Sequence, residues 1–403
     1  MPHRIPPLRT GHALQLLEGS AEYFPALVEA IEGARREVWL ETYIFDFTGS
    51  SAEVAWALER AARRGVDVRV VVDGFGSEEP PPAWRARLLE AGVNWRVFAP
   101  AGTVSVLWPG NWRRLHRKLC VVDGEVAFCG GINILDDLHD PNHGTLPAPR
   151  LDFAVRVAGP LVAQARTAML QLWQRMRTFE DLRRGDLGGA LTVLRRRPWL
   201  PAAEPPEPLQ GARAALVLRD NLRFRSSIER AYRRAIGRAR HEVIIANAYF
   251  VPGRKMRQAL VTAARRGVRV VLLLQGRYEY FMQYYAARPV YGALLRAGVE
   301  IHEYSPSFLH AKVAVIDGRW ATLGSSNLDP LSLLLAREAN VVIDDAAFAS
   351  LLRTRLLHAV AHEGQAMEVA QYAQRPLRER LLERVALAVM RLALAIQGKR
   401  TYW

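Results

Sequence analysis

The chain has 403 residues and half of them are apolar, which allows a sizeable core and excludes global disorder. Its net charge of +15 favours a polyanionic partner, either nucleic acid or an anionic membrane, although a solvated arginine-rich surface is the alternative. Two cysteines exclude a disulfide framework and a thiolate metal site. The first 18 residues lack the apolar core of a signal peptide, and no stretch reaches the ~20 apolar residues that span a bilayer.

Apolar runs alternate with helical patterns through the first half of the chain. A helical pattern that ends at Gly65 leads into a valine-rich run, and such uninterrupted runs between helices predict parallel strands covered on both faces. We expect strands at residues 36–45, 68–72, 93–98, 115–122, 126–129 and 153–157, followed by a helix at 160–176.

The second half repeats this order. The sequence Ala-Ala-Arg-Arg-Gly-Val occurs at residues 61–66 and again at 263–268. A period of about 200 residues indicates a domain duplication rather than a solenoid, and the fold class is α/β, formed twice. We expect the second set of strands at residues 241–250, 270–274, 299–304, 310–316, 321–324 and 340–343, with a helix at 347–362.

These repeats divide the chain into four parts. Residues 1–194 form an N-terminal domain, and the proline-rich residues 195–210 form an extended linker. Residues 211–365 form the C-terminal domain. Residues 366–403 include an amphipathic helix that either lies in a membrane interface or docks on the protein, and the sequence leaves both possibilities open.

One motif occurs in both halves. It consists of His-x-Lys, an Asp five residues after the Lys, and an Asn ten residues after the Asp. Of 55 cationic residues only four are lysines, yet lysine stands at both motif positions, where a compact ammonium differs from a guanidinium fork. The two copies comprise His116, Lys118, Asp123 and Asn133, and His310, Lys312, Asp317 and Asn327.

This pattern is suited to phosphoryl chemistry. Residues i and i+2 of a strand share a face, so each His projects beside its Lys. If the two strand ends meet, the lysines and asparagines can bind phosphate oxygens. One histidine can then attack phosphorus while the other serves as acid and base.

A nucleophilic histidine needs an acceptor on its far ring nitrogen. The candidate in the first half is Asp152 and the candidate in the second half is Glu338, each at the start of a strand beside its own motif. Asp123 and Asp317 complete the motifs and are grouped with the catalytic residues His116, Lys118, His310 and Lys312. Each precedes a glycine, however, so a turn aspartate that gives structural support is an equal alternative.

Two insertions distinguish the first half. Residues 107–114 contain Trp108 and Trp112 beside arginines, which favours a lipid interface over a core position. Residues 135–150 contain acidic residues and histidines that could be read as metal ligands. A solvated loop is the better interpretation, because two lysines already supply the charge of a metal ion. The residues in question are Asp136, Asp137, His139 and His143.

The doubled His-x-Lys-x4-Asp pattern resembles the signature of the phospholipase D superfamily, over nearly the whole chain. Four stretches are similar to bacterial cardiolipin synthases, specifically the B type: His116-Arg117-Lys118, Gly130-Gly131-Ile132-Asn133, Ala246-Asn247-Ala248-Tyr249-Phe250 and Gly324-Ser325-Ser326-Asn327-Leu328-Asp329-Pro330-Leu331-Ser332. Many superfamily members carry Arg where Pro330 and Leu331 stand, which bears on acceptor recognition.

The resemblance implies two duplicated phospholipase D-like α/β/α halves with one shared active site at their interface. It implies transfer of a phosphatidyl group from a donor phospholipid to phosphatidylglycerol, with His116 as nucleophile and His310 as acid and base. It also implies a peripheral enzyme on the cytoplasmic side of the cell membrane that needs no metal and no cofactor. The alternatives are a hydrolase or a nuclease of the same superfamily and a silent membrane-binding scaffold, and the tryptophan loop and C-terminal helix favour lipid over nucleic acid.

Overall fold

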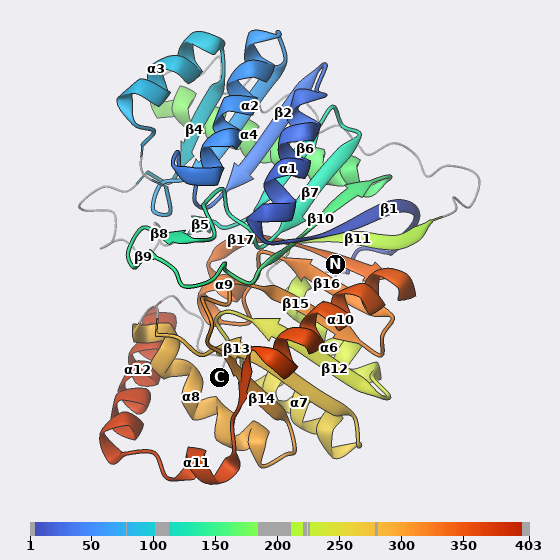
Figure 1. Ribbon diagram of the computed structural model, residues 1–403, viewed down its shortest axis with the longest axis vertical. Coiled ribbons are helices and arrows are strands. Elements are labelled where there is room, and N and C mark those ends of the chain that lie inside the picture. Colours follow the sequence, from blue (N-terminus) through green and yellow to red (C-terminus); the bar gives the residue numbers. More distant parts are fainter. Residues whose placement is uncertain are drawn as a thin grey trace.

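The computed structural model describes residues 5–77, 79–100, 113–183, 211–220, 224, 226–278 and 281–396. In this part of the chain one mixed sheet runs through both halves (Figure 1). Its strand order is β18-β14-β13-β12-β15-β16-β17-β11-β1-β10-β7-β6-β2-β3-β4.

The first half contributes strands β1 (Arg9–Glu18), β2 (Glu37–Thr42), β3 (Asp67–Asp73), β4 (Asn94–Phe98), β5 (Arg114–Leu115), β6 (Leu119–Val122), β7 (Val126–Gly130), β8 (His139–Asp140), β9 (Gly144–Thr145) and β10 (Phe153–Ala158). Its helices are α1 (Gly19–Glu32), α2 (Ala52–Arg63), α3 (Pro82–Ala91) and α4 (Leu161–Arg183).

The second half contributes strands β11 (Ala212–Arg219), β12 (Glu242–Asn247), β13 (Arg269–Gln275), β14 (Glu300–Tyr304), β15 (Lys312–Ile316), β16 (Trp320–Gly324), β17 (Ala336–Asp344) and β18 (Gly364–Ala366). Its helices are α6 (Ser227–Arg238), α7 (Arg254–Arg265), α8 (Phe281–Leu295), α9 (Pro330–Leu334), α10 (Ala346–His362), α11 (Val369–Ala373) and α12 (Leu377–Ile396).

The strand order confirms the duplication. Reading outward from the antiparallel pair β1–β11, the strands of one half match those of the other one for one, up to β4 and β14. The sequence did not predict β1 or β11, which join the halves. Along the main strand order, the expected parallel pairing holds within β2–β4 and within β12–β14. The motif strands β6 and β15 run antiparallel to β2 and β12, and the hairpin turn after each makes β7 and β16 antiparallel to them as well.

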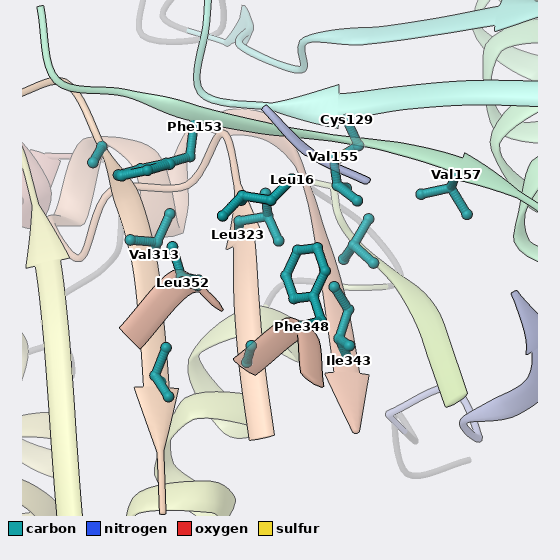
Figure 2. Packing of buried hydrophobic residues seen from close by; sticks show 14 of the residues in the cluster. Leu16, Cys129, Phe153, Val155, Val157, Val313, Leu323, Ile343, Phe348 and Leu352 are labelled. Atoms are coloured by element: carbon teal, nitrogen blue, oxygen red, sulfur yellow. The ribbon is translucent and has the colours of Figure 1, made fainter. Parts of the chain in front are cut away.

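The core lies in three layers. Helices α1, α2 and α3 cover the outer face of the first half, and α6, α7, α8 and α12 cover that of the second. Between the halves, the inner faces of both sheet regions pack around α4 and α10. Figure 2 shows this central layer, where Phe153 and Val155 of the first half face Val313, Leu323 and Phe348 of the second. Burial of this shared surface fixes the halves to each other.

The structure corrects the expected motif strand, whereas the expected linker and tryptophan loop lie outside the described residues. The strand expected at residues 115–122 is two strands, β5 and β6, with the His-x-Lys motif at the break between them. The proline-rich residues 195–210 and both tryptophans of the first insertion lie outside the described residues, so the domain boundaries remain predictions. Among the described residues, no helix is long and apolar enough to cross a membrane.

Candidate active site

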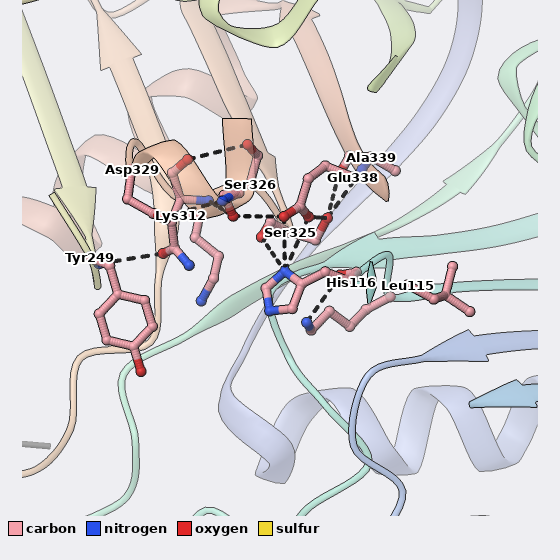
Figure 3. Close-up of polar contacts among 12 residues, drawn as sticks. Leu115, His116, Tyr249, Lys312, Ser325, Ser326, Asp329, Glu338 and Ala339 are labelled. Atoms are coloured by element: carbon pink, nitrogen blue, oxygen red, sulfur yellow. Dashed lines mark hydrogen bonds and ion pairs between the residues drawn. The ribbon is translucent and has the colours of Figure 1, made fainter. Parts of the chain in front are cut away.

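The first motif histidine is positioned by the opposite half of the molecule. The short strand β5 pairs with β17, and the backbone N–H of His116 donates to the carbonyl of Arg337 at 3.0 Å. This contact places Nδ1 of His116 3.1 Å from both carboxylate oxygens of Glu338 and 3.1 Å from the carbonyl of Ser325 (Figure 3). All of these partners are acceptors, so Nδ1 carries the proton and Nε2 is left with a free lone pair.

The second motif histidine has the reciprocal arrangement. The backbone N–H groups of His310 and Ala311 both donate to the carbonyl of Leu151, just before β10 in the first half. Nδ1 of His310 then lies 2.6 Å from a carboxylate oxygen of Asp152. Each histidine is therefore oriented by backbone and carboxylate groups that the other half supplies.

This crossing corrects the pairing expected from the sequence. Asp152 and Glu338 are the acceptors, as predicted, but Asp152 serves His310 and Glu338 serves His116. The sequence spacing between a histidine and the carboxylate of its own half could not show this, because the pairing is created by the packing of the two halves against each other.

The lysines of both motifs face one site. Nζ of Lys118 donates to the carbonyl of His116 at 3.0 Å and lies 5.3 Å from the ring centroid of Tyr43, and Nζ of Lys312 donates to the carbonyl of His310. Figure 3 shows Lys312 beside the ring of His116. Both lysine side chains are buried, so the site concentrates positive charge in a region of low dielectric.

Burial and the close lysines shift the pKa values of the site. Burial, reinforced by Lys312, lowers the pKa of Lys118 to about 7. Burial lowers the pKa of both histidines and the two lysines lower it further, although for His116 the carboxylate of Glu338 opposes this change. A bound phosphodiester would offset the lysine charges and so raise the pKa values of Lys118 and His310.

The two carboxylates respond differently to the same burial. Burial raises the pKa of Asp152 to about 7, even though Lys312 opposes this change. For Glu338, burial is outweighed by the neighbouring His116 and by hydrogen bonds, so its pKa falls below the usual value. Two hydroxyls donate to Glu338, from Ser325 and from Ser332 at 2.6 Å.

A cleft of about 540 Å³ opens on this site from the first half. Its lining combines aromatic side chains with polar groups and includes Asp152 and His310. Its lining includes the aromatic residues Tyr43, Phe45 and Phe75 and the polar residue Asn133. Such a cleft offers both apolar surface and a charged centre to an amphipathic phosphate ester.

A family model described as "Cardiolipin synthase, PLD-like domain" matches this chain twice, over residues 27–146 and 232–359. The chain belongs to this phospholipase D-like family of cardiolipin synthases. It is 37% identical over 377 residues to cardiolipin synthase B of Salmonella typhimurium, a match that covers 91% of this chain and 85% of the relative. It is 38% identical, with the same coverage, to cardiolipin synthase B of Escherichia coli K12.

This member of the cardiolipin synthase family has the same fold as a protein of known structure. The phosphatidylserine synthase of Haemophilus influenzae superposes with a TM-score of 0.69 over 98% of this chain and 97% of that one, at 12% sequence identity. The double match of the family model agrees with the duplicated halves of the sheet.

The motif aspartates lie away from this constellation, and this corrects their grouping with the catalytic residues. Asp123 and Asp317 occupy left-handed backbone positions, with φ of 54° and 51°, in the turns at the far ends of β6 and β15. The carboxylate of Asp123 accepts backbone N–H groups from Arg35, Arg36 and Glu37, and Asp317 does the same in the second half. Both fasten a hairpin to the start of a neighbouring strand.

The motif asparagines lie close to the site. The side-chain oxygen of Asn133 accepts from the N–H of Ile44 at 3.2 Å, and that of Asn327 accepts from Tyr249 at 3.4 Å. With the oxygen used in this way, each amide turns its NH₂ group away from that contact. Asn133 lines the cleft together with His310, where this group can donate to an anion.

The acidic insertion forms a network of its own. Asp136 accepts from Ser50 and from the N–H of Leu138, and Asp137 accepts from the N–H of Ser20. His143 contacts Asp140, which also pairs with Arg150. No group of three or more metal-ligating side chains occurs in the part of the chain that the structure describes.

Sequence reasoning missed three contributors to the site. The ring of Tyr43 lies edge-on to the ring of His116, with centroids 4.9 Å apart, and Ser325 and Ser332 donate to Glu338. Tyr43 follows directly after β2, whose end meets the first motif, so its place at a strand terminus was the available signal. The serines stand within the stretch after the second motif, but their target became visible only in the folded chain.

Proposed function

We propose that this protein is a cardiolipin synthase that transfers a phosphatidyl group from a donor phospholipid to phosphatidylglycerol through a phosphohistidine. The proposal is supported above all by the reciprocal arrangement of His116 on Glu338 and His310 on Asp152 around two buried lysines. Membership of the cardiolipin synthase family supports the choice of lipid substrates.

The lysines hold the substrate phosphate in this proposal. Lys118 and Lys312 contact the non-bridging oxygens, and the amide groups of Asn133 and Asn327 add donors. Offsetting the lysine charges restores basicity to His310, which prepares it to carry a proton when the substrate is bound.

His116 forms the covalent intermediate. Its Nε2 attacks phosphorus, an N–P bond forms, and the bond from phosphorus to the headgroup oxygen of the donor breaks. Glu338 stabilises the charge that develops on the imidazole, because His116, Lys118 and Ser325 keep its pKa low and the carboxylate ionised. His310 donates its proton to the departing alkoxide.

His310 then reverses its role. It removes the proton from a hydroxyl of phosphatidylglycerol, whose oxygen attacks phosphorus and displaces His116. The products are cardiolipin and the free headgroup alcohol of the donor. Water in place of the lipid alcohol would give hydrolysis, so access to the phosphohistidine decides between transferase and hydrolase.

The substrates place this protein at a membrane. Both lipids reside in a bilayer, so we propose peripheral association with an anionic phospholipid membrane, on the cytoplasmic side of the cell membrane. The net charge of +15 suits such a surface.

Expression in a bacterium that lacks cardiolipin tests the proposal. We expect new cardiolipin by lipid mass spectrometry, and none from the His116→Ala variant at equal protein level. Phosphatidic acid without cardiolipin would identify a hydrolase instead. No lipid product, together with nicking of plasmid DNA by the pure protein, would replace the proposal with a nuclease.

A further inference from the structure

Helix α12 has two faces of different character. One face packs against the second half, where Ala386 and Met390 are buried in the same cluster as Tyr291 of α8. Glu383 on this side is also buried and forms an ion pair with Arg375. This face therefore has its partners within the chain.

The opposite face is apolar and open to solvent. Leu377, Leu381 and Leu392 have exposed fractions of 80%, 63% and 62%. Six of the twelve exposed large hydrophobic residues in the described part of the chain lie on this one helix. They are Leu377, Leu381, Leu382, Val385, Val389 and Leu392. Such a concentration of exposed apolar area indicates a contact surface rather than ordinary surface decoration.

The charges on α12 distinguish between possible partners. The side chains of Arg378, Arg380 and Arg384 are exposed beside or among the apolar residues. Of the two acidic residues of α12, Glu379 is half-buried, and Glu383 is buried and paired with Arg375. An apolar stripe bordered by arginines matches a bilayer interface, where leucines enter the acyl boundary and arginines meet anionic headgroups.

We infer that the outward face of α12 docks this protein on an anionic phospholipid surface. The inference rests on the proposed function for its lipid partner, and it adds the surface that makes the contact. The sequence left two roles open for this helix, and the structure supports both at once: one face docks on the protein and the other faces outward.

The position of α12 suits delivery of lipid to the cleft. It packs along α8, which follows β13, and the carboxyl ends of β12 and β13 form the sheet edge where Lys312 lies. In Figure 1, α12 lies on the left side of the molecule, the same side as the β8–β9 hairpin. Asp140 and its neighbours in that hairpin line the catalytic cleft. A membrane bound by α12 therefore lies on the side of the molecule where this hairpin borders the cleft.

Vesicle sedimentation tests the surface. The wild-type protein should bind vesicles of phosphatidylglycerol and phosphatidylcholine, and the double variant Leu381→Gln/Leu392→Gln should bind at least about tenfold more weakly. Leu89→Gln is a matched control, because Leu89 is 75% exposed on α3, far from α12 in Figure 1, and should bind like wild type. Arg378→Gln/Arg384→Gln should weaken binding severalfold and reduce its dependence on salt.

Activity in detergent micelles separates this inference from the proposed function. The leucine variant should retain its melting temperature and its transferase rate on micellar lipids, and lose rate only on vesicles. Vesicle binding equal to wild type would overturn the inference. So would a concentration-dependent dimer that the variant abolishes while vesicle binding persists. A wild-type protein that binds vesicles but makes no product in either system would refute the proposed function and leave the docking surface intact.

Discussion

The two halves of the active site are built on the same strands but differ behind the histidines. In the second half, Ser325 follows the glycine that ends β16, and its hydroxyl donates to Glu338. The equivalent residue in the first half is Gly131, where any Cβ would collide with the carboxylate of Asp152. Asp152 has the N–H of Phe153 as a donor, at 2.8 Å, instead of two hydroxyls.

This difference shows how a symmetric scaffold can divide labour. Burial raises the pKa of Glu338, but His116, Lys118 and the hydroxyl of Ser325 together lower it below its usual value, so Glu338 stays ionised. The buried Asp152 has its pKa raised to about 7 and titrates near neutrality. A fixed anion suits the histidine that must carry positive charge in a covalent intermediate. A carboxylate poised near neutrality suits the histidine that exchanges protons. This difference supports the proposal that His116 is the nucleophile and His310 the acid and base.

The largest effect should come from removing each histidine. His116→Ala and His310→Ala should each lower phosphatidyl transfer by at least about 10³-fold. With a p-nitrophenyl phosphodiester, whose leaving group needs no acid, His310→Ala should still form a covalent adduct and His116→Ala should not. Intact-protein mass spectrometry at neutral pH measures the adduct, and an adduct in His116→Ala alone would reverse the assignment.

The next effect compares the two carboxylates. Glu338→Gln should lower kcat by about 10³–10⁴-fold, because it removes the anion behind the nucleophile and favours the wrong tautomer. Asp152→Asn should cost less, about 10–10²-fold, since its carboxylate is only partly ionised near pH 7. Steady-state rates on micellar lipid give both numbers, and equal losses would contradict the division of labour.

A smaller effect is expected from the hydroxyl that distinguishes the halves. Ser325→Ala removes one hydrogen bond to a charged carboxylate, which is worth about 1.5–3 kcal/mol, and should raise the pKa of Glu338. We expect kcat to fall by about tenfold, and we expect the acidic side of the pH profile of kcat to move to higher pH. Ser332→Ala is the matched variant on the other oxygen of Glu338. An unchanged acidic limb in both would show that the serines only pack.

The smallest effect concerns pH. Because the pKa of Lys118 is about 7, its ammonium is charged below that pH and neutral above it, so kcat/KM for an anionic lipid should fall severalfold as pH rises from 7 to 9. The Lys118→Arg side chain remains charged over this range, so the variant should lose the alkaline fall of kcat/KM, at some cost in rate. Lys312→Arg keeps a positive charge beside Lys118 and should show the same alkaline fall of kcat/KM as the wild type. A wild-type profile flat to pH 9 would contradict the assignment.

The sequence predicted much of the fold because the halves repeat local patterns. Strands β2, β3, β12 and β13 and the hairpins after each motif follow from apolar runs, glycine caps and turn residues, which act over a few positions. It did not predict β1 and β11, because their role is to pair with each other across about 200 residues. It also placed both histidines within strands, whereas His116 directly follows β5, which pairs with β17, and His310 precedes β15.

The sequence by itself identified the groups that we propose carry the chemistry: two histidines, two lysines, Asp152 and Glu338. Their residue types and their recurrence in two copies depend only on the order of amino acids. The tertiary structure decided which acceptor serves which histidine, that Asp123 and Asp317 fasten hairpins, and that α12 has one face packed and one face open. These outcomes depend on how the two sheet regions pack across a shared core, and packing between distant segments is not encoded in any local pattern.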